Sequence, residues 1–195
     1  MPPTTLAARS VGAAIVLIVP VVAEILWPSF GDSGHLVFAA SQLLGWFLVA
    51  GVVIDIGRRH PRLEMMRSGR IGRRLLTVCC AFQMLFAMTY GASTLWRGEP
   101  WEPAFVLFLV GFLAQLVGGV VWWRAMRVEP SLQATRASLL ATAVLGFLAM
   151  AIGQSPWHDI CLLASYAAWG ATGVSASRAR IADRDVVSSP SPRRH

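Results

Sequence analysis

Long apolar segments alternate with short polar connectors along most of the chain. A helix needs roughly 20 largely apolar residues to cross a hydrocarbon core about 30 Å thick. The strands of a membrane barrel would instead alternate apolar and polar residues in stretches of about ten, and these runs do not alternate. The pattern therefore predicts an all-α integral membrane protein, a bundle of six transmembrane helices near residues 11–27, 35–56, 75–96, 104–123, 138–154 and 159–177.

The six segments are predicted to form three helical hairpins. Each hairpin starts after an arginine (Arg9, Arg74 or Arg136), turns at a connector containing tryptophan and proline, and ends at further arginines. Tryptophan at helix ends suits the headgroup region, because its ring is apolar and its N–H is polar. We take residues 1–182 as one transmembrane domain and expect residues 183–195, rich in serine, proline and arginine, to be a disordered cytoplasmic tail.

The composition supports a membrane protein and narrows its chemistry. Hydrophobic residues make up 55% of the 195 residues and charged residues only 14%, whereas a soluble domain carries roughly 25% charged residues. All 17 basic residues are arginine. The absence of lysine excludes a Walker A nucleotide site, a retinal Schiff base and pyridoxal-phosphate catalysis.

The arginines also indicate an orientation. Arg97 is the exception among the 17, since all the others lie at the termini or in the second and fourth connectors, on one side of the predicted helices. By the positive-inside rule, both termini are cytoplasmic and the protein lies in the cell membrane. The asymmetry accounts for the net charge of +7, so membrane lipids are the expected partners and nucleic acid is not. Asp55 is expected to pair with Arg58 or Arg59 at the inner face.

The first apolar segment has an alternative interpretation as a signal peptide. Val21, Val22 and Ala23 resemble a cleavage site, although the basic start at Arg9 is weak and late. Cleavage there would leave five helices, with the later ones oriented as before.

Polar side chains within the predicted spans are the best indication of function, because burying them unpaired costs several kcal/mol. Glu24 follows Pro20 by four residues, and proline can bend a helix toward a cavity. We predict an outward-facing polar cavity, with Glu24, His35, His158 and Asp159 at its mouth, Gln42, Gln83, Tyr90 and Gln115 at its floor, and Trp46 and Tyr166 among its binding residues. The alternative is that the glutamines simply bond one another between helices.

No cofactor or metal is expected. The histidines lack the HExxH or HxxxH spacing of a zinc hydrolase. A haem held by His35 and His158 is disfavoured, because histidines at outer helix ends are commonly interfacial. Cys79 and Cys80 are adjacent and form no CxxC pair, which argues against thiol–disulfide chemistry.

The first functional hypothesis is an acid–base membrane enzyme of isomerase or cyclase type. Glu24, or Asp159 paired with His158, would donate a proton to a lipophilic or isoprenoid-like substrate. The rings of residues such as Trp46, Tyr90 and Tyr166 would stabilise a developing cation. The chain resembles small membrane-bound terpene cyclases only in size and in having acids near helix ends.

Two alternatives are open. A six-helix chain with both termini inside is similar in outline to the substrate-capturing subunits of energy-coupling vitamin transporters. That resemblance implies a cavity for a small amphiphilic molecule and partner membrane subunits, although the first outer connector, residues 28–34, is shorter than in those subunits. The other alternative is an accessory structural membrane protein without a ligand.

Overall fold

The computed structural model describes residues 3–26, 31–99, 101–152 and 156–188, and in these ranges the chain is helical apart from short turns. Within them lie seven α-helices and three short 3-10 helices, Glu102–Ala104, Met126–Val128 and Pro130–Leu132. Six of the α-helices are long and apolar enough to cross a membrane, as the sequence predicts, and the seventh is the short α3. The α-helices are α1 (Pro3–Leu26), α2 (Gly31–Arg59), α3 (Pro61–Met65), α4 (Arg67–Arg97), α5 (Phe105–Ala125), α6 (Gln133–Ile152) and α7 (Pro156–Ser188).

Several helices extend well beyond the apolar segments that predicted them. The α1 helix starts at Pro3 and α4 at Arg67, about two turns earlier than expected, because hydropathy marks only the apolar part of a helix. Backbone hydrogen bonding continues into these polar turns, which contain no proline after the first residue of α1. At the other end of the chain, α7 runs to Ser188, so the predicted disordered tail begins within a helix. Residues 189–195 of that tail lie outside the described residues.

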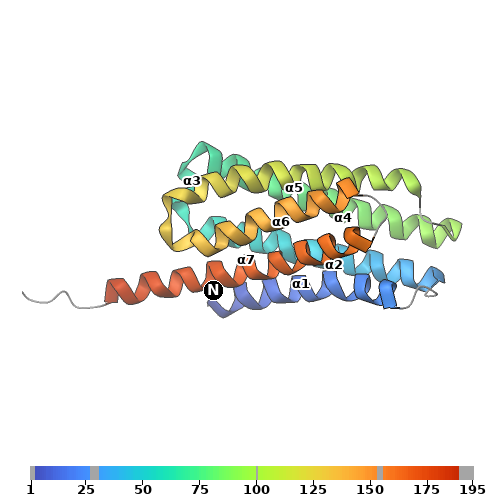
Figure 1. Cartoon of the computed structure of the whole chain (residues 1–195), viewed down its shortest axis with the longest axis horizontal. Helices are drawn as coiled ribbons and strands as arrows, with labels where there is room; N and C mark the ends of the chain where they lie inside the picture. Colours follow the sequence, from blue (N-terminus) through green and yellow to red (C-terminus); the bar gives the residue numbers. More distant parts are fainter. Residues whose placement is uncertain (1–2, 27–30, 100, 153–155, 189–195) are drawn as a thin grey trace, which may run out of the picture.

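The six long helices form a ring in chain order. Each one packs against the next along the chain, and α7 packs against α1, so that the first and last helices lie side by side (Figure 1). The α2 helix packs against α4 at least as extensively as it packs against α1. The predicted grouping into three hairpins is therefore not confirmed. The α1 helix is a full member of this ring, packed between α2 and α7.

Small residues allow two pairs of helices to approach closely. A Cβ atom added at Gly72 on α4 would lie 2.7 Å from the backbone nitrogen of Trp122 on α5. Between α1 and α7, Gly173 packs directly against the Ser10 side chain. The Ser10 hydroxyl donates a hydrogen bond of 2.7 Å to the carbonyl oxygen of Trp169. These contacts make close backbone packing the basis of the α4–α5 and α1–α7 pairs.

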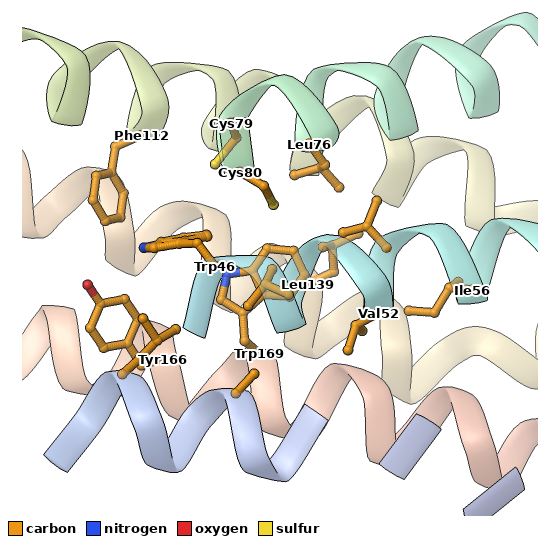
Figure 2. Packing of buried hydrophobic residues seen from close by; sticks show 14 of the residues in the cluster. Trp46, Val52, Ile56, Leu76, Cys79, Cys80, Phe112, Leu139, Tyr166 and Trp169 are labelled. Atoms are coloured by element: carbon orange, nitrogen blue, oxygen red, sulfur yellow. The ribbon is translucent and has the colours of Figure 1, made fainter. Parts of the chain in front are cut away.

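Large aromatic side chains fill the middle of the bundle. Trp46 from α2 lies between Phe112 from α5 and Tyr166 from α7, and none of the three is exposed (Figure 2). Both pairs are edge-to-face, with ring centroids 6.2 Å apart, the favourable geometry for aromatic contacts. The centre of the ring is thus a packed core and not a channel.

Ion pairs stabilise one end of the bundle, which we call the arginine-rich end. It contains the start of α1, the α2–α4 and α5–α6 connections and the later part of α7 (Figure 1). Here Arg9 on α1 donates a hydrogen bond of 2.6 Å to the Asp55 carboxylate on α2. The expected pairing of Asp55 with Arg58 or Arg59 is wrong, because Gly51, one turn earlier on α2, leaves room for the Arg9 side chain to cross. A second pair, Arg73–Glu64, joins α4 to α3 at 2.7 Å.

Candidate functional site

A cavity of about 670 Å³ lies at the opposite end of the bundle, which we call the arginine-poor end. All six long helices contribute to its lining. Its volume falls in the range of roughly 300–1,000 Å³ that is typical of small-molecule sites. Most of the lining side chains are apolar, so the cavity is less polar than the sequence predicts.

Four of the predicted site residues line this cavity together. Glu24 comes from the last turn of α1, Tyr90 from α4, and His158 and Asp159 from the first turn of α7. Glu24 is exposed and Asp159 partly exposed, and within the described part of the chain neither carboxylate makes a hydrogen bond or an ion pair. The structure thus brings all three predicted catalytic residues to one cavity.

A hydrogen bond to the backbone orients His158. Its Nδ1 atom lies 2.7 Å from the carbonyl oxygen of Ala149 on α6. A carbonyl oxygen only accepts, so Nδ1 must carry the hydrogen and donate it. In the neutral ring, Nε2 then has a free lone pair and can act as a base. The same bond links the two facing ends of α6 and α7.

Tyr90 is held by the remaining predicted mouth residue, His35. The Tyr90 hydroxyl and His35 Nδ1 are 2.7 Å apart, and the two rings meet edge to face with centroids 5.7 Å apart. His35 itself is not among the residues that line the cavity. Its place in the site is therefore behind Tyr90, where it orients the phenol ring.

Phenylalanines form the wall of the cavity, a feature that was not predicted from the sequence. Phe86 on α4 packs against Phe105 and Phe108 on α5, with ring centroids 5.5 and 4.8 Å apart. Tyr90 extends the wall, with its centroid 6.0 Å from that of Phe105. The spacing of these residues in the sequence could have predicted the wall, because residues three or four apart on a helix share a face. Phe105 and Phe108 on α5 have this spacing, and so do Phe86 and Tyr90 on α4.

The cavity reaches the outside of the bundle beside α5. Val106 and Leu109 line it and also continue the exposed stripe of α5 that includes Leu113 and Val117. Exposed apolar stripes of this kind face lipid in a membrane bundle. The opening thus lies next to the hydrocarbon-facing surface.

Two of the predicted floor residues join helices and do not line the cavity. Gln83 on α4 donates a hydrogen bond of 3.2 Å to the carbonyl oxygen of Phe108 on α5. Gln115 on α5 donates a bond of 2.8 Å to the carbonyl oxygen of Thr142 on α6. Both side chains are fully buried. Both glutamines thus bond between helices, but to backbone carbonyls and not to one another as the alternative had it.

Gln42, Trp46 and Tyr166 form a separate buried cluster. The Gln42 Oε1 atom accepts one hydrogen bond from Trp46 Nε1 at 3.0 Å and another from the Tyr166 hydroxyl at 3.1 Å. The cluster links α2 to α7, and none of its three residues lines the cavity. Three of the four predicted floor residues, Gln42, Gln83 and Gln115, thus lie in the packed core, whereas the fourth, Tyr90, lines the cavity.

The groups that line the cavity are mainly apolar and aromatic, with a few acidic and imidazole side chains. Within the described ranges, no three side chains of histidine, cysteine, aspartate or glutamate are placed to hold a metal ion. The cavity instead combines an aromatic wall with two carboxyl groups and one imidazole. No protein-family profile, curated protein or solved structure matches the chain. Functional inference therefore rests on the geometry of the cavity.

Proposed function

We propose that the protein binds a lipophilic molecule in the cavity at the arginine-poor end and acts on it by acid–base chemistry, as an isomerase or cyclase would. The observation that carries the proposal is the convergence of Glu24, His158 and Asp159 on one largely apolar cavity. Apolar sites with a few polar groups are the usual form of small-molecule sites. The opening beside α5 gives a lipid-soluble substrate a route from the membrane.

The proposed chemistry needs one group that gives a proton and one that takes a proton. A carboxyl group of Glu24 or Asp159 exchanges a proton with the substrate, and His158 Nε2, left free by the bond from Nδ1 to Ala149, accepts or returns the other. One proton is added and one is removed, so the substrate changes its bonding without changing its composition. The aromatic wall stabilises positive charge that develops between the two steps.

We further infer that the arginine-rich end faces the cytoplasm in the cell membrane, with both termini inside. The exposed arginines Arg62, Arg70, Arg124 and Arg127 at this end support the inference by the positive-inside rule. The cavity then opens in the outer half of the bilayer. The repeated order of arginine, helix, connector, helix and arginine still favours helix hairpins as the unit of insertion.

Mass spectrometry of the purified protein tests the proposal. The full chain is purified in a mild detergent, its bound molecules are extracted, and the main lipophilic species is incubated with fresh protein. Conversion to a product of the same mass but different chromatographic retention is the expected result. Glu24→Gln or Asp159→Asn, whichever removes the carboxyl group that transfers the proton, should slow conversion at least about a hundredfold, the usual contribution of an acid–base group, while Glu102→Gln serves as the control. Glu102 is exposed at the same end and does not line the cavity.

Each other outcome has a definite meaning. A molecule that is retained but never converted refutes the enzyme and favours the binding or transport subunit. If Glu24→Gln and Asp159→Asn both convert the molecule at the native rate, neither carboxyl group takes part in the proton transfer. Protein that carries no lipophilic molecule and takes none up supports a structural role.

A further inference from the structure

We infer that the ligand of this cavity carries a positive charge on an apolar frame, as a protonated or quaternary amine or another lipophilic organic cation does. The inference rests on the proposed function and names its substrate class.

The charge of the lining is one-sided. Glu24 and Asp159 are both acidic, and none of the lining residues that the structure describes is an arginine. Arg97, on the last turn of α4, lies at the same end of the bundle but lines a different surface hollow with Trp96 and Trp101. A ligand with an anionic head would meet two carboxylates and, among the described lining residues, no arginine.

The two cavity carboxylates differ from those at the arginine-rich end in having no partner among the residues that the structure describes. There, Asp55 pairs with Arg9 at 2.6 Å and Glu64 pairs with Arg73 at 2.7 Å. Glu24 and Asp159 form no such pair with any described residue. A carboxylate beside an apolar wall is stabilised when an opposite charge approaches, because pairing lowers the cost of holding charge next to apolar surface. The missing counter-charge is therefore the part of the site that a cationic ligand supplies.

The aromatic wall favours the same kind of ligand. Phe86, Tyr90, Phe105 and Phe108 surround one side of the cavity, with neighbouring ring centroids 4.8–6.5 Å apart. Ring faces carry partial negative charge and attract organic cations, and the attraction grows when water is excluded. The rings also bury the apolar part of the ligand. Two independent features of the lining, carboxylates and ring faces, thus select for positive charge.

An inorganic cation fits the site less well. No metal-binding group of three acidic, histidine or cysteine side chains exists in the described ranges. The cavity volume of about 670 Å³ is that of a site for a molecule of many atoms. The charge that the site attracts is therefore expected on an organic ligand.

Two ions of the same shape and opposite charge provide the test. Binding of tetraphenylphosphonium and of tetraphenylborate to the purified full chain in an uncharged detergent is measured by equilibrium dialysis. We expect the cation to bind at least about tenfold more tightly than the anion, a difference of about 1.4 kcal/mol. Glu24→Gln and Asp159→Asn should each weaken cation binding several-fold. Phe105→Leu should also weaken cation binding, because it removes one ring face from the wall of the cavity. Glu24→Asp keeps the carboxylate and should therefore bind the cation more tightly than Glu24→Gln does, with most of the affinity of the native protein.

Controls separate folding from binding and separate this inference from the proposed function. Glu102→Gln removes an exposed carboxylate at the same end and should leave binding unchanged. Thermal unfolding and gel filtration identify any variant that fails to fold, and Glu24→Asp then serves as the conservative replacement. Equal binding of both ions, binding insensitive to both carboxylates, or no binding of either ion overturns the cationic ligand. If the protein still converts a co-purifying lipophilic molecule in that case, the proposed function stands. If no such molecule co-purifies, both the cationic ligand and the proposed function are overturned.

Discussion

At the scale of single residues, the mid-bundle amides act mainly on stability. Gln42 accepts hydrogen bonds from both Trp46 and Tyr166, and its own Nε2 atom has no partner within the described residues. Replacing it with leucine leaves two buried donors unpaired but also removes the unpartnered amide nitrogen. The first effect is larger, since each orphaned donor costs about 1–3 kcal/mol in protein interiors.

We therefore expect Gln42→Leu to lower the stability of the purified protein by about 1–2 kcal/mol. Thermal unfolding followed by circular dichroism in detergent measures the change. Gln133→Leu is the matched control, because Gln133 is exposed at the start of α6, and it should change stability little. Equal stability of the Gln42 variant and the native protein would show that this cluster contributes nothing.

The candidate site was only partly predictable, and the reason lies in what a sequence pattern can carry. Glu24, His158 and Asp159 were found because charged residues near the ends of apolar runs are conspicuous. Gln83 and Gln115 lie on helix faces that pack against a neighbouring helix. The sequence pattern shows which residues share a face, but it does not show whether that face meets a cavity or a backbone carbonyl. The partner of Asp55 was missed because the choice of Arg9 depends on how α1 crosses α2.

At the scale of helices, the close crossing of α4 and α5 depends on Gly72. A Cβ atom there would meet backbone atoms of Trp122, which cannot move aside as a flexible side chain does. Overpacking of this kind costs about 1–3 kcal/mol. We expect Gly72→Ala to lower the melting temperature by about 2–6 °C in spite of the better helix propensity of alanine.

Gly12→Ala is the matched control for this substitution. Gly12 lies inside α1, and an added Cβ atom would have no neighbour within 4 Å. Its replacement should leave the melting temperature unchanged or raise it, because alanine stabilises a helix by up to about 1 kcal/mol relative to glycine. Identical melting temperatures for the two variants would contradict a tight α4–α5 crossing.

Helix number was predictable and helix length was not. Six apolar runs of sufficient length give six spans, because a hydrophobic segment of that length has few other stable environments. The arginine-containing turns at the start of α1 and α4 remain helical outside the apolar region, and hydropathy does not report on them. The ring arrangement is set by contacts between distant residues, such as Ser10 with Trp169, which no local pattern contains.

At the scale of the whole molecule, the distribution of arginine predicts how the protein lies in its membrane. Single cysteines at Arg62, on α3, and at Glu99, after α4, lie at opposite ends of the bundle, and both native residues are exposed. Native Cys161 is half-buried and is replaced by serine in the background, while Cys79 and Cys80 are fully buried. We expect a membrane-impermeant maleimide to label Glu99→Cys on intact cells and Arg62→Cys only after lysis.

The opposite labelling pattern would place the cavity in the inner half of the bilayer and would reverse the proposed orientation. Labelling of both positions on intact cells would show that the membrane had been damaged. The background variant without an added cysteine measures any reaction of Cys79 and Cys80.

The closure of the ring by α1 and α7 has a consequence for biosynthesis. Ser10 meets its hydrogen-bond partner only when Trp169 has been made, a separation of 159 residues along the chain. At about 5–20 residues per second, the ribosome needs roughly 8–30 seconds to cover that distance. Throughout this interval the side of α1 that later contacts α7 is covered only by lipid or by membrane chaperones. The last helix therefore covers the side of α1 that stays without protein contacts until then. A chain that terminates before α7 leaves that side of α1 uncovered.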